Sequence, residues 1–206
     1  MGALLGTFVG VVLALLSLRW SRAYLVTIQS GITISPWLSF GLIMVGGTTS
    51  ALIWASFSVT SALLGIVTCL LIVQTPLDLL VRRLARWPTL LALLAVSVIR
   101  ILEAASDARL REVITQFAAT AALLAILTVF YRLSPQSLGW GDVLLVAPLS
   151  IAVTSVRSSL IIIWMLTASS SAALHGLVLW RRSGSRHAPF GPHLLGAAWL
   201  VLVLSV

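Results

Sequence analysis

Long runs of apolar residues alternate with short polar segments along the chain. A helix rises about 1.5 Å per residue and a bilayer has a hydrocarbon core about 30 Å thick, so each run predicts a helix that crosses a membrane. The fourth and sixth runs are the shortest for this purpose. The pattern predicts an all-α polytopic integral membrane protein with about eight transmembrane helices. The runs lie at about residues 2–18, 36–56, 57–77, 88–102, 113–131, 143–156, 158–180 and 190–206.

Composition agrees with a chain whose main solvent is lipid. Hydrophobic residues make up 60% of the 206 residues, charged residues make up 9%, and the mean hydropathy is +1.12. A water-soluble domain of this size needs a more polar exterior. We therefore expect the lipid bilayer as a partner. The runs divide into an N-terminal two-span segment, residues 1–56, and a six-span core, residues 57–206, within a single membrane domain.

All thirteen basic residues are arginine, and the net charge is +8. Their scatter between apolar runs argues against a nucleic-acid partner and is typical of topology signals. Nine of the thirteen fall in alternate connections, which predicts that these connections face the cytoplasm and that both termini lie outside an inner (cytoplasmic) cell membrane. The nine are Arg19, Arg22, Arg82, Arg83, Arg86, Arg132, Arg181, Arg182 and Arg186.

Acidic residues are few, and two of them stand apart. The segment EAASDARLREV (103–113), predicted to be a solvated outside loop, holds three of the five acids. The other two, Asp78 and Asp142, fall at cytoplasmic ends of predicted spans. Two carboxyls brought together share a proton, so that one acts as a base on water and the other as an acid, as in aspartyl proteolysis. Alternatively, Asp142 is a helix cap, an interpretation that suits Asp78 poorly. Both interpretations stay open on pattern alone.

Three motifs resemble those of a known family. GWGD at 139–142 resembles the GxGD motif of the type IV prepilin peptidases, which are membrane aspartyl proteases. PFGP at 189–192 resembles a signature just before the last span of that family. DLLVRRLARW at 78–87 is similar to the family's first aspartate and the basic turn after it. The motifs occur in the family's order within residues 57–206.

The resemblance implies a fold, an activity and site residues. Asp78 and Asp142 would be the catalytic pair that cuts leader peptides from prepilin-like protein substrates on the cytoplasmic side. Gly139 and Gly141 would let the backbone turn so that the second carboxylate faces the first. The residues Phe190, Gly191 and Pro192 would support the site.

The chain is similar to a short form of the family. Larger members carry a cytoplasmic insert with paired Cys-x-x-Cys motifs, whereas the connection here is RWSRAYLVTIQSGITIS and Cys69 is the one cysteine. Neither a metal, nor a cofactor, nor N-methyltransferase activity is therefore expected. Substrate identity and oligomeric state are not predicted by this pattern.

The chain departs from the family at three positions. Ala85 replaces a usual proline, Leu144 replaces a common lysine, and His193 replaces an aromatic residue. These departures leave a second interpretation open, in which the chain is a non-catalytic pilus-assembly relative. The same alternative includes a small transporter that uses the two aspartates for proton or ion binding. His175, inside the seventh run, is interpreted as bonded to a neighbouring helix.

Overall fold

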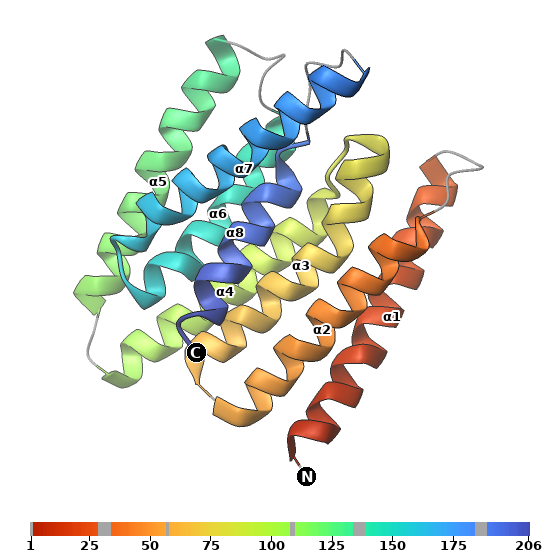
Figure 1. The fold of residues 1–206 in the computed structure, drawn as a ribbon. Helices are drawn as coiled ribbons and strands as arrows, with labels where there is room; N and C mark the ends of the chain where they lie inside the picture. Colours follow the sequence, from red (N-terminus) through yellow and green to blue (C-terminus); the bar gives the residue numbers. More distant parts are fainter. Residues whose placement is uncertain (1, 29–33, 57, 108–109, 134–138, 184–188) are drawn as a thin grey trace.

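The structure is a computed structural model of the chain and describes residues 2–28, 34–56, 58–107, 110–133, 139–183 and 189–206. Within these residues every regular element is a helix (Figure 1), so the predicted all-α fold is confirmed. Each predicted apolar run coincides with one helix. The helices are α1 (Gly2–Ile28), α2 (Pro36–Ser56), α3 (Val59–Val81), α4 (Arg86–Asp107), α5 (Leu110–Leu133), α6 (Trp140–Val156), α7 (Leu160–Ser183) and α8 (Gly191–Val203).

Helix lengths fit a membrane protein. Within the part of the chain that the structure describes, five helices are long and apolar enough to cross a bilayer, namely α2, α3, α4, α5 and α7. The apolar helices α6 and α8 are shorter, with 17 and 13 residues. Pro192 lies in the first turn of α8, where a proline costs no hydrogen bond, and so helps to fix the start of that helix. The chain is an all-α polytopic membrane protein.

Two helices are longer than the hydropathy pattern predicts. Helix α4 extends from Arg86 to Asp107, because Pro88 fits its first turn and the polar residues at its far end continue the helix. Helix α1 continues to Ile28, through much of the segment predicted to be a connection. This extension contains neither proline nor glycine, and Leu25 within it is buried. Burial of an apolar face thus prolongs the helix beyond the strictly apolar run.

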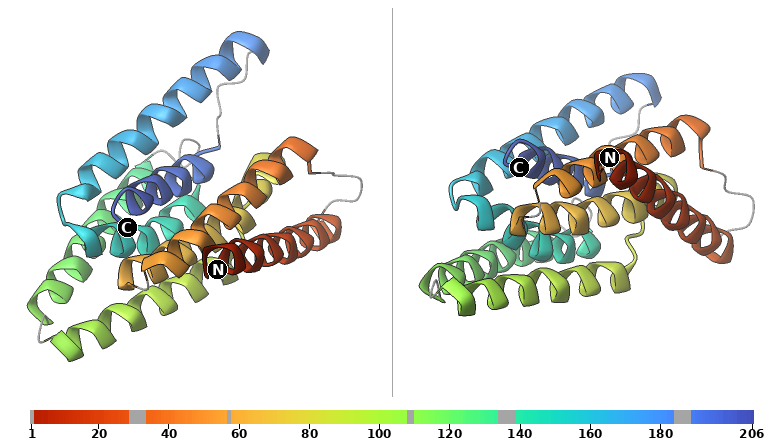
Figure 2. Two further views of the ribbon diagram at one scale, coloured as in Figure 1. Left: turned by 60° about the horizontal axis from the view of Figure 1, so that its bottom comes forward. Right: turned by 90° about the horizontal axis from the view of Figure 1, so that it is seen from below.

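Helices α3 and α6 lie at the centre of the bundle (Figure 2). Helix α6 packs against α3, α4, α5, α7 and α8, and α3 packs against α1, α2, α4, α6 and α8. Leu64 of α3, Leu149 of α6 and Leu195 of α8 belong to one core cluster and are fully buried. The two aspartates singled out in the sequence therefore lie on the two central helices.

The predicted N-terminal segment packs directly on the rest of the bundle. Helices α1 and α2 contact each other and both contact α3. The Thr68 hydroxyl donates to Thr49 Oγ1 at 3.0 Å, and Trp199 Nε1 of α8 donates to the same oxygen at 2.9 Å. These bonds join α2 to α3 and to α8. A division of the chain between residues 56 and 57 stays a prediction.

The arginine-rich helix ends lie together. The C-terminal ends of α1, α3, α5 and α7 lie at one end of the bundle, and the two chain termini lie at the opposite end (Figure 1). Arg132 and Arg181 are in the last turns of α5 and α7. The alternation of charge along the sequence thus becomes a separation of charge between the two ends of the molecule.

Candidate active site at the arginine-rich end

Asp78 lies near the C-terminal end of α3 and is 6% exposed. Its Oδ2 accepts a hydrogen bond from the backbone N–H of Gly191 at 3.0 Å. Gly191 is the first residue of α8, whose N-cap residue Phe190 supplies no side-chain cap. The first N–H groups of a helix have no partner within the helix, and its N-terminus favours negative charge. The carboxylate of Asp78 therefore caps a helix that begins 113 residues later.

Asp142 lies in the first turn of α6. Its Oδ2 accepts a hydrogen bond from the Gly139 N–H at 3.2 Å. Its Oδ1 is buried and has no hydrogen-bond partner within the described residues. A carboxylate oxygen that is enclosed but unpaired costs free energy, and such a group at a pocket wall is a candidate for contact with a reactant.

The two aspartates line one pocket of about 630 Å³. Tyr24 of α1, Trp140 and several arginines line the same pocket. Asp78 of α3 and Asp142 of α6 thus bring two carboxyl groups to the walls of one pocket. Like charges in a partly enclosed site disfavour ionisation of both groups at once, so the arrangement suits a pair that holds one proton.

The glycines of the two later motifs stand where a side chain would collide. A Cβ atom at Gly191 would lie 2.7 Å from Asp78 Oδ2, and one at Gly139 would lie 3.0 Å from Asp142 Oδ2. A Cβ atom at Gly141 would lie 3.0 Å from Leu84 Cβ. Other groups thus approach the backbone of all three glycines closely, and most closely at Gly191.

The expectation that Gly139 serves to turn the chain is therefore corrected. Its φ of −79° and ψ of 144° are angles that most residues adopt. The constraint at this position is the carboxylate of Asp142 beside it, not the backbone conformation.

Leu84 joins the three motif segments. It follows Asp78 in the turn after α3, touches the site of Gly141, and lies 3.3 Å, through Cδ2, from the site of a Cβ at Gly191. It also lines the pocket. The segments at 78–87, 139–142 and 189–192 thus meet around one leucine side chain.

The turn after Asp78 is held by a buried glutamine. Arg82 ends α3 in the left-handed region, with φ 54°, and donates its N–H to the Asp78 carbonyl oxygen at 3.0 Å. Gln74 is fully buried; its Oε1 accepts from the Ala85 N–H at 2.9 Å and its Nε2 donates to the Ala85 oxygen at 2.7 Å. Its Nε2 also donates to Thr89 Oγ1 at 3.0 Å.

These two bonds between Gln74 and Ala85, the Gln74 clamp, require an N–H at position 85. Proline has no N–H, so a proline at this position would lose the bond to Gln74 Oε1. Sequence reasoning missed Gln74, although an amide inside the apolar run CLLIVQTPL was a visible signal. Tyr24 was missed as well, because it falls in the segment predicted to be a connection.

The PFGP residues form the entry to α8. Phe190 packs against the main core cluster, and Pro192 lies in the first turn. His193 Nε2 lies 3.0 Å from His175 Nδ1, and its Nδ1 lies 3.0 Å from Ser171 Oγ. The interpretation of His175 as bonded to a neighbouring helix is confirmed. His187, near the same motif, lies outside the described residues.

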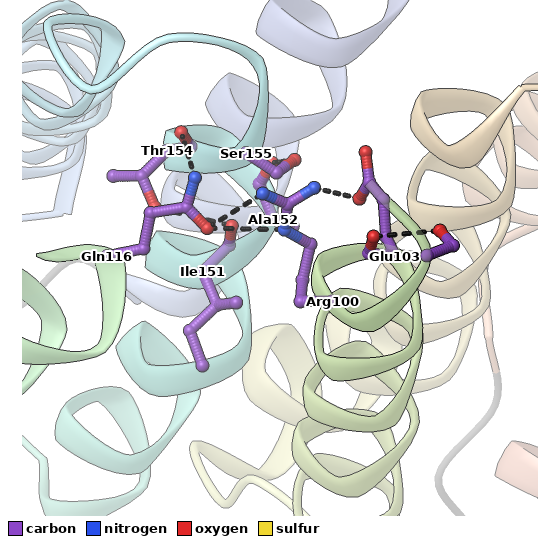
Figure 3. Close-up of polar contacts among 8 residues, drawn as sticks. Arg100, Glu103, Gln116, Ile151, Ala152, Thr154 and Ser155 are labelled. Carbon is purple, nitrogen blue, oxygen red and sulfur yellow. Dashed lines mark hydrogen bonds and ion pairs between the residues drawn. The ribbon is translucent and has the colours of Figure 1, made fainter. Parts of the chain in front are cut away.

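A second polar cluster lies near the end of α4, the start of α5 and the end of α6, at the end of the bundle opposite the aspartates (Figure 1). Figure 3 shows its contacts. Arg100 of α4 is 4% exposed and pairs with Glu103 one turn later. Its Nε and Nη2 donate to Gln116 Oε1 at 3.2 and 3.0 Å. The acid Glu103 was expected in a solvated loop; it lies instead on a helix, because Arg100 offers it a charged partner within reach along that helix. Sequence reasoning assigned no role to Arg100.

No protein-family model, curated protein or solved structure matches the chain. What the fold and composition define is the class, an all-α polytopic membrane protein. Membership of the prepilin peptidase family stays a prediction that rests on the three motifs. The expectation of a site without metal or cofactor also stays a prediction.

Proposed function

We propose that this protein is a membrane aspartyl endopeptidase whose catalytic pair is Asp78 and Asp142. The observation that supports the proposal most directly is that both carboxyls line the same pocket, although they come from different helices. The family resemblance adds the substrate, a prepilin-like precursor whose leader peptide is removed.

In the proposed reaction the two carboxyls differ in protonation. The ionised aspartate takes a proton from a water molecule, and the water oxygen attacks the carbonyl carbon of the scissile peptide. The protonated aspartate gives its proton to the carbonyl oxygen. The C–N bond then breaks, and the leaving nitrogen takes a proton from one of the pair. Asp142 lines the pocket and its Oδ1 accepts no hydrogen bond within the described residues, which supports it as a member of the pair.

We also propose the orientation of the chain. The pocket lies at the arginine-rich end of the bundle, since Arg82, Arg83 and Arg86 line it. The positive-inside rule favours the cytoplasm on that side. Cleavage would then take place at the cytoplasmic face of the inner membrane, with both termini outside.

The competing explanation is purely structural. Each aspartate accepts an N–H at the start of a helix, and a cap of this kind is sufficient to account for both contacts. The two explanations differ in what they demand of the side chain. A cap needs an acceptor oxygen, which asparagine also has, whereas general-base catalysis needs a group that can bind a proton.

The deciding experiment is co-expression with a prepilin that has a Gly-Phe junction, followed by gel mobility of the pilin. Asp78→Asn and Asp142→Asn should each abolish cleavage, and the double variant should be no worse than either single variant. Asp107→Asn, a carboxylate change at the other end of the bundle, is the matched control. Cleavage by Asp142→Asn at the wild-type rate would refute the proposal. Failure of the wild type on every prepilin would favour the non-catalytic relative.

A further inference from the structure

A second cavity lies at the end of the bundle opposite the aspartates. It measures about 610 Å³ and is formed by the first turns of α5, the last turn of α6 and the connection to α7. Arg111 and Arg157 line it from different elements. It shares no lining residue with the first pocket. Nothing in the proposed peptidase reaction uses it.

The inner wall of this cavity is a buried hydrogen-bonded chain (Figure 3). Gln116 and Thr154 line the cavity and are 5% and 2% exposed. Arg100 Nε and Nη2 both donate to Gln116 Oε1, and Gln116 Nε2 donates to the Thr154 carbonyl oxygen at 3.2 Å. The amide is thereby held with its oxygen toward Arg100. The group that Gln116 offers to a ligand is its NH₂, a hydrogen-bond donor.

The charges around the cavity favour a singly charged anion. Arg111 and Arg157 form no ion pair within the described residues. Glu112 lines the cavity too and offsets one of the two positive charges. The cavity thus offers two guanidinium groups, an amide donor and a net charge near +1, a combination suited to a phosphodiester.

The position of the cavity indicates which kind of molecule carries that phosphodiester. Helices α5 and α7 begin at this end as apolar segments of 24 and 23 residues that are long enough to cross a bilayer. Arginines at the first residues of such segments lie at the depth of lipid headgroups. We propose that this cavity binds the headgroup phosphodiester of an anionic phospholipid, with Arg111 and Arg157 as ionic donors and Gln116 as the neutral donor.

The test is titration of the full-length protein, purified in a neutral detergent, with phosphatidylglycerol, measured by native mass spectrometry. The wild type should hold phosphatidylglycerol more tightly than phosphatidylcholine. Arg111→Gln and Arg157→Gln should each weaken the tightest bound phosphatidylglycerol by about tenfold. Arg132→Gln, an exposed arginine at the other end of α5, is the matched control and should bind as the wild type does. Equal affinity in all four proteins would overturn the proposal.

Two further measurements keep the result interpretable. Phosphatidylglycerol should raise the thermal unfolding midpoint of the wild type and of Arg132→Gln more than that of Arg157→Gln. A rise of equal size in Arg157→Gln would overturn the assignment. Inorganic phosphate and glycerol 3-phosphate should fail to displace the lipid. Displacement by inorganic phosphate would show that the cavity takes a free oxyanion and would overturn the lipid source.

Discussion

The carboxylate of Asp78 accepts a hydrogen bond from the backbone N–H of Gly191, 3.0 Å away and 113 residues further along the chain. This contact places the end of α3 against the start of α8. It also leaves no room for a side chain at Gly191, because a Cβ atom there would lie 2.7 Å from Asp78 Oδ2. The relation between these two residues leads to the first prediction.

Gly191→Ala should destabilise the protein by about 1–3 kcal/mol, because the added methyl group must push either Asp78 or the first turn of α8 away. Thermal unfolding of the detergent-solubilised protein, followed by tryptophan fluorescence, measures the effect. The matched control is Gly196→Ala in the same helix, where nothing lies within 4 Å of the new Cβ atom. That variant should be neutral or stabilising by up to about 1 kcal/mol. Equal unfolding midpoints for both variants would show that the Asp78 contact is not tight.

Asp142 should respond differently to replacement by asparagine and to replacement by alanine. Asp142→Asn keeps an oxygen for the Gly139 N–H, so its free energy of unfolding should change by less than about 0.5 kcal/mol. Asp142→Ala removes the acceptor and should cost about 0.5–2 kcal/mol. If the proposed function holds, both variants lose peptide cleavage. A variant that loses stability and activity together, in proportion, would point to the cap as the whole role of Asp142.

The Gln74 clamp predicts that a proline is unfavourable at position 85. Ala85→Pro removes the N–H that donates to Gln74 Oε1 at 2.9 Å, and it should lower the free energy of unfolding by about 1–3 kcal/mol. Gln74→Leu, which leaves the buried Ala85 backbone without its partner, should cost a similar amount. The double variant should cost less than the sum of the two single variants, because the two residues share one interaction. Strict additivity would mean that the clamp is not what holds the turn.

The buried guanidinium of Arg100, toward the end of the bundle opposite the aspartates, leads to a fourth prediction. Gln116→Leu leaves two N–H groups of Arg100 without an acceptor, although Arg100 keeps its ion pair with Glu103, and should destabilise the fold by about 1–3 kcal/mol. Arg100→Met combined with Gln116→Leu should recover much of this loss, because the buried N–H groups that lost their acceptor are then absent. Chemical denaturation monitored by circular dichroism compares the three proteins. A double variant as unstable as Gln116→Leu alone would show that packing, not charge, governs this cluster.

Topology is tested by labelling single cysteines in a Cys69→Ala background. A cysteine at Arg83 should react with a membrane-impermeant reagent only from the cytoplasmic side, and one at Arg157 only from the opposite side. Both arginines are exposed, so the label has access to each position. Labelling of both from the same side would contradict the arrangement of the helix ends seen in Figure 1.

The local pattern of hydropathy was enough to predict the eight helices, because a segment that crosses lipid must bury all its backbone polar groups within itself. The same reasoning fails where neighbours supply the stabilisation. Helix α1 continues past its apolar run because Leu25 packs against other helices, and α4 continues because Arg100 pairs with Glu103. Helix ends are therefore the part of the secondary structure that tertiary contacts decide.

The sequence by itself determined that the chain is helical and suited to a membrane, that its arginines alternate along the connections, and that Asp78 and Asp142 are the two acids set apart from the others. Each of these follows from residue type and spacing. Only the tertiary structure decided which groups meet: Asp78 with Gly191, Leu84 with Gly141, Gln74 with Ala85. These partners are joined by packing of α3, α6 and α8, and the distance between two residues in a bundle depends on how helices are arranged around each other, which the periodicity of any one helix does not specify.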